Sequence, residues 1–189
     1  MQREEAMQLL LEYNESEALI RHALAVEGVM RYFAKKLGED PDKWGVIGLL
    51  HDLDYEKYPE QHCKKSAEIL KARDIDPEII RAVVSHGWGI CSDVEPQHTM
   101  EKVLYAIDEL TGLINATALM RPSKSVMDLE YKSLWKKYKS PAFAAGVDRS
   151  IIEKGAEMLG MELRDVIEET ITGMRSVSSA IGLDGVAAE

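Results

Sequence analysis

The sequence predicts an all-α protein built as a single compact helical domain. Across most of the chain, apolar residues recur every three or four positions, which is the period of an amphipathic helix and not of a strand. Asp-Pro pairs at residues 40–41 and 76–77 each supply a capping side chain followed by a proline suited to a first helical turn. No segment shows convincing strand alternation, so we expect helices throughout.

The expected helices are marked by their apolar stripes, and two of them also by a glycine that can end a helix. Gly38 and Gly160 follow two of the stripes and are suited to ending a helix. Residues 87–96 are rich in Gly, Ser, Asp and Pro, which predicts a loop. In chain order, the expected helices cover residues 16–37, 41–51, a segment that begins at Pro59, 77–86, a long stretch from 100 toward 121, 125–138, 148–159 and 163–174.

The length of 189 residues suits one domain with a substantial core. We expect that domain to span residues 1–175, with a metal-binding part at about 20–120. Residues 176–189 are expected to be a flexible C-terminal tail. A composition that is 46% hydrophobic and 30% charged is typical of a globular protein and not of a disordered one.

The net charge and the number of cysteines limit which partners the protein can bind and in which cellular compartment it works. The excess of 33 acidic over 23 basic residues gives a net charge of −10, which opposes non-specific binding to nucleic acid or to an anionic membrane. A nucleic-acid partner would need a local basic patch. The chain has two cysteines and no CxxC pair, which is too few for a disulfide framework, so we expect it to work in a reducing compartment of the cell. Residues 1–13 lack the apolar core of a signal peptide, and no run is long enough to span a bilayer, so we expect a cytoplasmic protein.

Histidines and acidic residues from several helices fall on the buried stripes. His22 lies three residues after Leu19, so it faces the core. His51, His86 and Asp108 continue the apolar rows of their own helices in the same way. Desolvated imidazoles and carboxylates that face one another are costly unless a cation compensates them. The pattern therefore indicates a metal ion.

These residues stand in the segments HALAVEGVM, GLLHDLDYE, VVSHG and LYAIDELTG. The ordered series of His22, the doublet His51-Asp52 and then Asp108 in a helical chain resembles the HD superfamily of metal-dependent phosphohydrolases. The resemblance covers roughly residues 20–120. It implies that His22, His51, Asp52 and Asp108 bind metal, and that Asp52 and Asp108 are catalytic.

In members of the superfamily with a two-metal site, two further histidines lie between the doublet and the last aspartate. His62 and His86 match these positions, and the resemblance implies that they hold a second ion with Asp52 bridging both. The expected cofactors are one or two divalent transition-metal ions, with Fe, Mn, Co, Ni and Zn left open. Such an ion lowers the pKa of its bound water, so the expected reaction is hydrolysis of a phosphate ester or anhydride on a small phosphorylated substrate, for example a nucleotide.

Other side chains have weaker assignments. Residues 121–139 are the one basic concentration in an acidic chain, and Arg121 and Lys124 are predicted to bind the substrate phosphate, although a solvated helix face is an equal alternative. Asp54 and Tyr55 could orient water or substrate, but a solvated turn is the favoured interpretation. Cys63 and Cys91 are most simply small buried side chains.

Two other function classes remain open from the sequence. The resemblance also reaches di-iron oxygenases, which use the same six ligands to activate O₂. A non-catalytic module that senses a nucleotide or a metal is the third possibility, and nothing resembles an attached output domain. Whether the chain forms a homodimer is not decided by the sequence.

Overall fold

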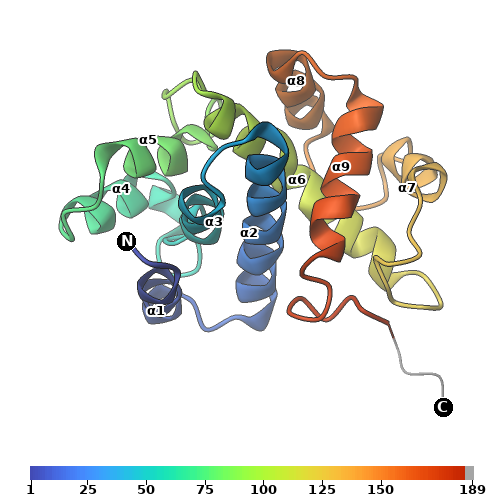
Figure 1. Cartoon of the computed structure of the whole chain (residues 1–189), viewed down its shortest axis with the longest axis horizontal. Coiled ribbons are helices and arrows are strands. Elements are labelled where there is room, and N and C mark those ends of the chain that lie inside the picture. The colour runs from blue at the N-terminus through green and yellow to red at the C-terminus, as the bar shows by residue number, and fades with distance from the viewer. Residues whose placement is uncertain (186–189) are drawn as a thin grey trace.

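The computed structural model describes residues 1–185, and these residues form helices joined by turns and loops (Figure 1). The all-α prediction is confirmed, because the described part of the chain contains only two isolated β-bridges and no strand. The elements are α1 (Arg3–Tyr13), α2 (Glu17–Leu37), α3 (Pro41–Leu50), the 3₁₀ turn η1 (Pro59–Gln61), α4 (Lys64–Lys71), α5 (Pro77–Ser85), α6 (Thr99–Leu119), α7 (Tyr131–Tyr138), α8 (Arg149–Leu159) and α9 (Leu163–Arg175).

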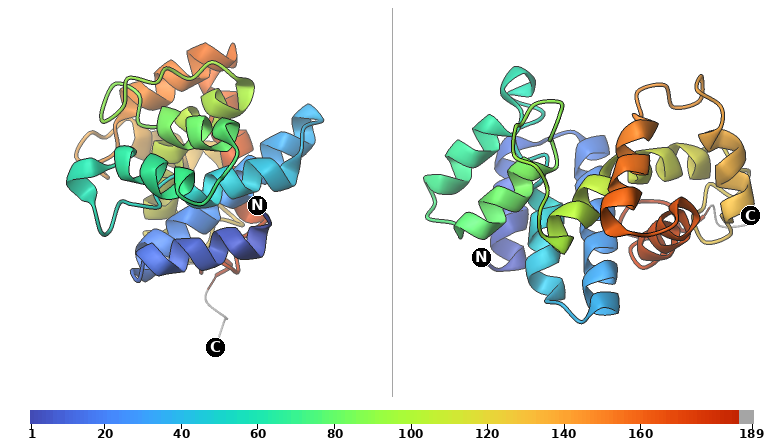
Figure 2. Two further views of the ribbon diagram at one scale, coloured as in Figure 1. Left: turned by 90° about the vertical axis from the view of Figure 1, so that its left-hand side faces the viewer. Right: turned by 90° about the horizontal axis from the view of Figure 1, so that it is seen from above.

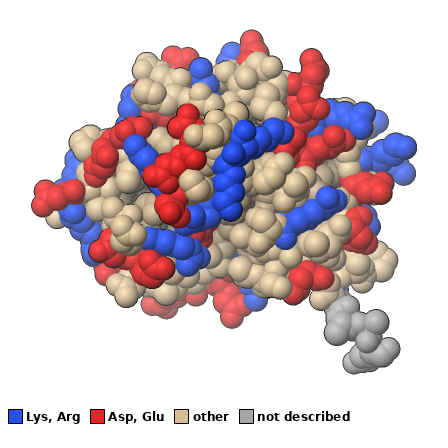
Figure 3. Space-filling view, viewed as in Figure 1, with Lys and Arg blue, Asp and Glu red and all other residues tan. Residues whose placement is uncertain are grey.

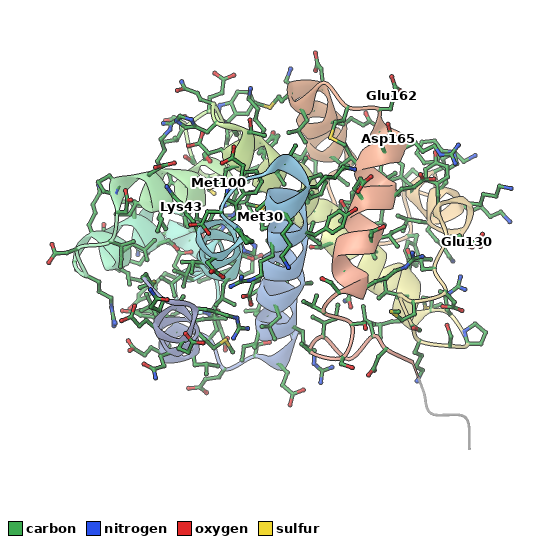
Figure 4. The ribbon with its side chains drawn as sticks, in the orientation of Figure 1. Met30, Lys43, Met100, Glu130, Glu162 and Asp165 are labelled. Atoms are coloured by element: carbon green, nitrogen blue, oxygen red, sulfur yellow. The ribbon has the colours of Figure 1, made fainter. Side chains whose placement is uncertain are left out.

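The two longest helices, α2 and α6, organise the core. Helix α2 packs against α3, α6 and α9, and α6 packs also against α8. Helices α4 and α5 lie on one side of α2, while α7, α8 and α9 lie on the other (Figure 2). Met30 of α2 and Met100 of α6, both labelled in Figure 4, are buried, as their apolar stripes predict. Each large apolar side chain removed from water contributes about 1.5–3 kcal/mol.

Helix α3 approaches α2 closely at Gly48. A Cβ atom at Gly48 would lie 3.0 Å from the backbone oxygen of Val26 and 3.0 Å from the backbone nitrogen of Glu27. Only a residue without a side chain permits this backbone contact. The close crossing brings the end of α3, where His51 lies, against the buried face of α2.

Helix boundaries agree with the predicted caps in most places. The Asp40 carboxylate accepts hydrogen bonds from the backbone N–H groups of Asp42 and Lys43, at 2.9 and 3.2 Å. Gly38 ends α2 in the left-handed conformation at φ 76°. Pro59, by contrast, starts a 3₁₀ turn, and α4 begins at Lys64. Helix α1 was not predicted from the sequence.

The predicted helix over residues 125–138 is too long at its N-terminal end, because α7 begins only at Tyr131. Residues before it are paired with the C-terminal segment: Val126 N–H donates to the Leu183 carbonyl at 2.9 Å, and Ser125 Oγ donates to the same oxygen at 3.1 Å. Ile181 and Leu183 are buried. These apolar side chains complete the core, so the packed part of the chain extends past residue 175 to Leu183, while the flexible tail over residues 176–189 stays a prediction. Residues 186–189 lie outside the described part.

The surface carries both signs of charge. Figure 3 shows acidic and basic side chains interspersed over one face, with Lys and Arg gathered also at the edge where α7 lies. Within residues 1–185, no helix combines the length and apolar character that crossing a membrane requires.

Candidate metal centre

Three predicted ligands meet where α2, α3 and α6 pack together. His22 Nε2 lies 2.9 Å from Asp108 Oδ1 and 3.1 Å from His51 Nε2. His51 Nε2 lies 3.3 Å from the same Asp108 oxygen. We call His22, His51 and Asp108 the first half-site.

The other two histidines meet beside them. His62 follows η1, and His86 follows α5 at its C-terminal end. Their Nε2 atoms lie 3.1 Å apart. We call His62 and His86 the second half-site.

Asp52 lies between the two half-sites and directs one oxygen at each. Its Oδ2 is 3.7 Å from His22 Nε2 and 3.4 Å from His51 Nε2. Its Oδ1 is 3.4 Å from His62 Nε2 and 3.4 Å from His86 Nε2. A carboxylate that divides its oxygens in this way is positioned to bridge two cations.

The ring nitrogens that point away from the centre are held by acceptors. His51 Nδ1–H donates to the Gly48 carbonyl at 2.8 Å, and His86 Nδ1–H donates to the Val83 carbonyl. His62 Nδ1–H donates to Asp54 Oδ1 at 2.7 Å. In the neutral rings, these bonds leave the Nε2 lone pairs facing inward. Outer acceptors of this kind are the usual orienting partners of metal-binding histidines.

This donor set fits divalent metal ions. Lone pairs of His62 and His86 that face each other at 3.1 Å have no proton between them when both rings are neutral, so they need a shared cation. Ligand atoms bound at about 2.1 Å lie about 3.0–3.4 Å apart in octahedral or tetrahedral geometry. The separations of 2.9–3.3 Å between ligand atoms within the half-sites are close to that range.

Ionisation in the metal-free chain follows the same pairing. Burial lowers the pKa of His51, but the carboxylates of Asp52 and Asp108 outweigh it and hold that pKa well above its ordinary value. Burial raises the pKa of Asp108, and the imidazoles of His51 and His22 reverse this, so the net pKa is lowered. Burial lowers the pKa of His62, but the hydrogen bond to Asp54 and the charges of Asp52 and Asp54 together outweigh it, so the net pKa is raised. Protons thus occupy the positions that cations would take.

The site contains one buried residue whose role the sequence analysis missed. Asp54 was expected on a solvated turn, but its side chain is fully buried and also accepts the backbone N–H of Ser66 at 2.7 Å. It therefore orients His62 instead of meeting solvent. The feature of the sequence that could have indicated this role is the position of Asp54, two residues after Asp52. Tyr55 is half exposed, and its ring packs edge-on against His62 at 5.2 Å between centroids.

Two adjoining cavities open at the site. One of about 340 Å³ is lined by every half-site ligand except the fully buried His51, together with Asp52, Tyr55, Ile90, Cys91 and Glu109. Burial and the nearby Asp108 carboxylate raise the pKa of Glu109 to about 7. The other cavity, of about 160 Å³, shares His22 and Gly112 with the first and extends along α2 and α6 past Arg21 and Asn115 to Gly182.

The structure does not bring Arg121 and Lys124 to this place. Both follow the end of α6 at Leu119. Leu119 is itself eleven positions beyond Asp108, which corresponds to about 16 Å along the helix, so the two residues begin far from the metal centre. Arg121 is instead paired with Asp128, at 2.8 Å between Nη2 and Oδ2. Neither residue lines the metal cavity. The helical periodicity identified α6, but it gave no measure of how far its end lies from Asp108.

The cysteines lie beside the second half-site. Cys63 is buried, as expected, whereas Cys91 is exposed and lines the larger cavity. Their Sγ atoms are 3.1 Å apart. The hydrogen bond from the Cys63 thiol lowers the pKa of Cys91 to about 6, and the same contact raises the pKa of Cys63.

Comparison with known proteins agrees with this geometry. The HD domain family matches residues 19–113, which are 95 of the 189 residues and include both half-sites and Asp52. The chain belongs to the HD domain family, a superfamily of metal-dependent hydrolases. The resemblance seen in the sequence is confirmed.

Among individual proteins, the chain is similar to a tRNA (cytidine(56)-2'-O)-methyltransferase of Picrophilus torridus, with 30% identity over 133 residues. The match covers 62% of this chain and 39% of that protein, so the chain spans about two fifths of the relative's length. No solved structure matches the chain significantly.

Proposed function

We propose that the chain is a metal-dependent phosphohydrolase that hydrolyses a phosphate ester or anhydride of a small molecule such as a nucleotide. The observation that carries the proposal is Asp52, whose two carboxylate oxygens face two separate pairs of imidazole nitrogens at 3.4–3.7 Å. An arrangement that holds two cations close together suits phosphoryl transfer to water. Methyl transfer, which the Picrophilus relative is named for, has no comparable support in this donor set.

Bound divalent cations would supply a water of lowered pKa and would neutralise charge that develops on the phosphoryl oxygens. The chain's own groups hold and orient them. His22, His51 and Asp108 provide ligands on one side, and His62 and His86 provide ligands on the other. Asp54 keeps the proton on His62 Nδ1 and so keeps Nε2 available.

For the phosphate receiver, we propose Arg21 in place of Arg121 and Lys124. Arg21 directly precedes His22 and lines the smaller cavity, which adjoins the metal cavity at His22 and Gly112. Among the described residues that line these two cavities, it is the only Lys or Arg. Its present partner is the exposed Glu17 at 3.0 Å, and an exposed pair of this kind is worth little. A phosphate oxygen can therefore take the place of Glu17.

Elemental analysis of the purified chain, followed by a screen of nucleotides and small phosphates, tests the reaction. We expect up to two equivalents of transition metal and release of inorganic phosphate that persists anaerobically with redox-inert ions. Turnover that requires O₂ and redox-active iron would establish the oxygenase alternative instead. Tight nucleotide binding without turnover would favour a sensor.

Arg21→Ala tests the phosphate receiver. We expect KM to rise about tenfold with metal content unchanged, because a charge-assisted hydrogen bond contributes about 1.5–3 kcal/mol. Arg164→Ala is the matched control, since Arg164 also forms an exposed i,i+4 pair, with Glu168 at 2.9 Å, but lines a different cavity. Equal KM values for the two variants would contradict the assignment.

A homodimer and a cytoplasmic location stay predictions.

A further inference from the structure

The chain's two cysteines are far apart in sequence but in contact in the fold. Cys63 and Cys91 are separated by 28 positions, and their Sγ atoms lie 3.1 Å apart. Both sulfurs rest on Gly87, where a Cβ atom would lie 2.4 Å from the Cys91 sulfur and 2.5 Å from the Cys63 sulfur. Because glycine leaves this space free, the two thiols can meet over the backbone of residue 87.

The two thiols differ in accessibility. Cys63 is 1% exposed, whereas Cys91 is an exposed residue of the segment between α5 and α6. A small solution oxidant therefore reaches Cys91 first, and Cys63 stands behind it as the second thiol. This is the arrangement of an attacking and a resolving cysteine.

Their backbones also differ in conformation. Cys63 has φ 65°, a left-handed conformation that is rare for residues with a side chain. Cys91 is in a loop that is tied to Gly87 by backbone hydrogen bonds, including Cys91 N–H to the Gly87 carbonyl at 2.9 Å. A disulfide bond is about 2.05 Å long, so closing the pair requires a movement of about 1 Å. The loop that carries Cys91 can supply that movement while the buried Cys63 stays in place.

We propose that Cys63 and Cys91 are a reversible redox site that a peroxide oxidises to an intramolecular disulfide. In the first step, the Cys91 sulfur attacks one peroxide oxygen, the O–O bond breaks, and Cys91 becomes a sulfenic acid as water leaves. In the second step, the Cys63 sulfur attacks the Cys91 sulfur, the S–O bond breaks, and the thiol proton leaves with the hydroxyl as a second water. Both thiols lose one electron each, and the peroxide is reduced by two electrons.

The bond would act on the second half-site. Cys63 directly follows His62, and the loop that carries Cys91 begins just after His86. The 3.1 Å separation of the two histidine Nε2 atoms belongs to the reduced arrangement. Because the loop that carries Cys91 moves toward Cys63, it pulls on the chain just after His86, so we expect oxidation to weaken metal binding at the second half-site. This consequence rests on the proposed metal site, whereas formation of the disulfide does not.

The experiment treats the purified, metal-free chain with hydrogen peroxide, then denatures it in N-ethylmaleimide and measures intact mass. We expect a monomer that takes up no maleimide, and two maleimides after reduction. Because the fold holds the thiols together, oxidation should be at least about tenfold faster in the native chain than in urea. Retained maleimide uptake, disulfide-linked dimers, or equal rates in the two conditions would overturn the proposal.

Two variants separate the pair from a single reactive thiol. In Cys91→Ser, an exposed loop change, we expect the remaining buried Cys63 to be slow to oxidise. In Cys63→Ser, we expect peroxide to convert Cys91 to sulfinic acid, with folding verified by circular dichroism. If peroxide quickly made Cys63 unreactive toward maleimide in the Cys91→Ser chain, the assignment would be contradicted.

A second measurement compares zinc binding by the reduced and oxidised chains. We expect about tenfold weaker affinity for one of two equivalents after oxidation, as for other disturbances beside metal ligands. Unchanged affinity would reject the coupling. These measurements use no phosphate substrate, so a failure of the hydrolase proposal would not be mistaken for a failure of this one.

Discussion

The two half-sites use similar ligands but are built on different kinds of backbone. His22 and Asp108 lie within helices of 21 residues each, and His51 directly follows α3 with no exposed side-chain surface. His62 lies between a three-residue 3₁₀ turn and the eight-residue helix α4, and His86 is the last residue before a long loop. The first half-site thus takes two of its three ligands from the interior of long helices, whereas both ligands of the second lie just outside helix ends.

This difference indicates which half can adapt. Helices that pack against one another have one low-energy arrangement, so the first half-site is preorganised by the core. Helix ends and loops carry fewer packing constraints, and the second half-site depends instead on Asp54, Tyr55 and the cysteine pair. We infer that the first half-site holds its metal more tightly and that the second responds more to its surroundings.

Asp52→Ala should have the largest effect, because Asp52 faces both half-sites. We expect loss of both metal equivalents and a fall in phosphatase activity of about 10³-fold or more, since cations supply several kcal/mol of transition-state stabilisation. Elemental analysis and initial rates measure the two losses. Full activity in this variant would reject the metal assignment, and circular dichroism shows whether the fold persists.

His51→Ala and His62→Ala divide the two half-sites. We expect His62→Ala to retain one tightly bound equivalent, because the first half-site remains intact. His51→Ala should lose both the tighter equivalent and about 1–3 kcal/mol of stability, since it empties a buried space and leaves the Gly48 carbonyl without its partner. Zinc titration and thermal unfolding measure these changes. If the two variants behave alike, the half-sites are not independent.

Asp54→Asn should affect the second half-site alone. An amide cannot accept hydrogen bonds at both of the positions that His62 and Ser66 now occupy, so His62 loses its fixed orientation. We expect affinity for one equivalent to fall about 10–100-fold. Asp93→Asn, an exposed change in the loop after α5, is the matched control. A loss of affinity for the tighter equivalent would contradict the division.

The smallest effect is the proton release that accompanies metal binding. The raised pKa values of His51 and His62 mean that both rings remain partly protonated above their ordinary value of 6.5. Metal entry must expel these protons, so binding weakens as pH falls. We expect zinc addition to release protons at neutral pH, with the number falling as pH rises through the raised pKa values. Titration in a weak buffer measures it, and no release near pH 7 would show that the rings are already neutral.

Much of the fold was predictable because the local signals agree with one another. The 3.6-residue periodicity and the capping residues Asp40 and Asp76 located α2, α3, α5 and α6 within a few residues. Residues 125–130 were wrongly assigned to a helix. Their backbone is held instead by a hydrogen bond to Leu183, and that partner is too distant in sequence for a local pattern to reveal it. Asp54 was misjudged for a similar reason: a carboxylate after an apolar run looks solvated until its distant hydrogen-bond donors are known.

The sequence by itself determined the helical class, the inward direction of His22, His51, His86 and Asp108, and the family resemblance. These properties depend on short-range periodicity and on residue order, which one chain displays directly. Only the tertiary structure decided that Asp52 divides its oxygens between two histidine pairs, that Arg21 and not Arg121 adjoins the metal cavity, and that the two cysteines touch. Those relations depend on distances between segments, and distances are fixed by how the helices pack.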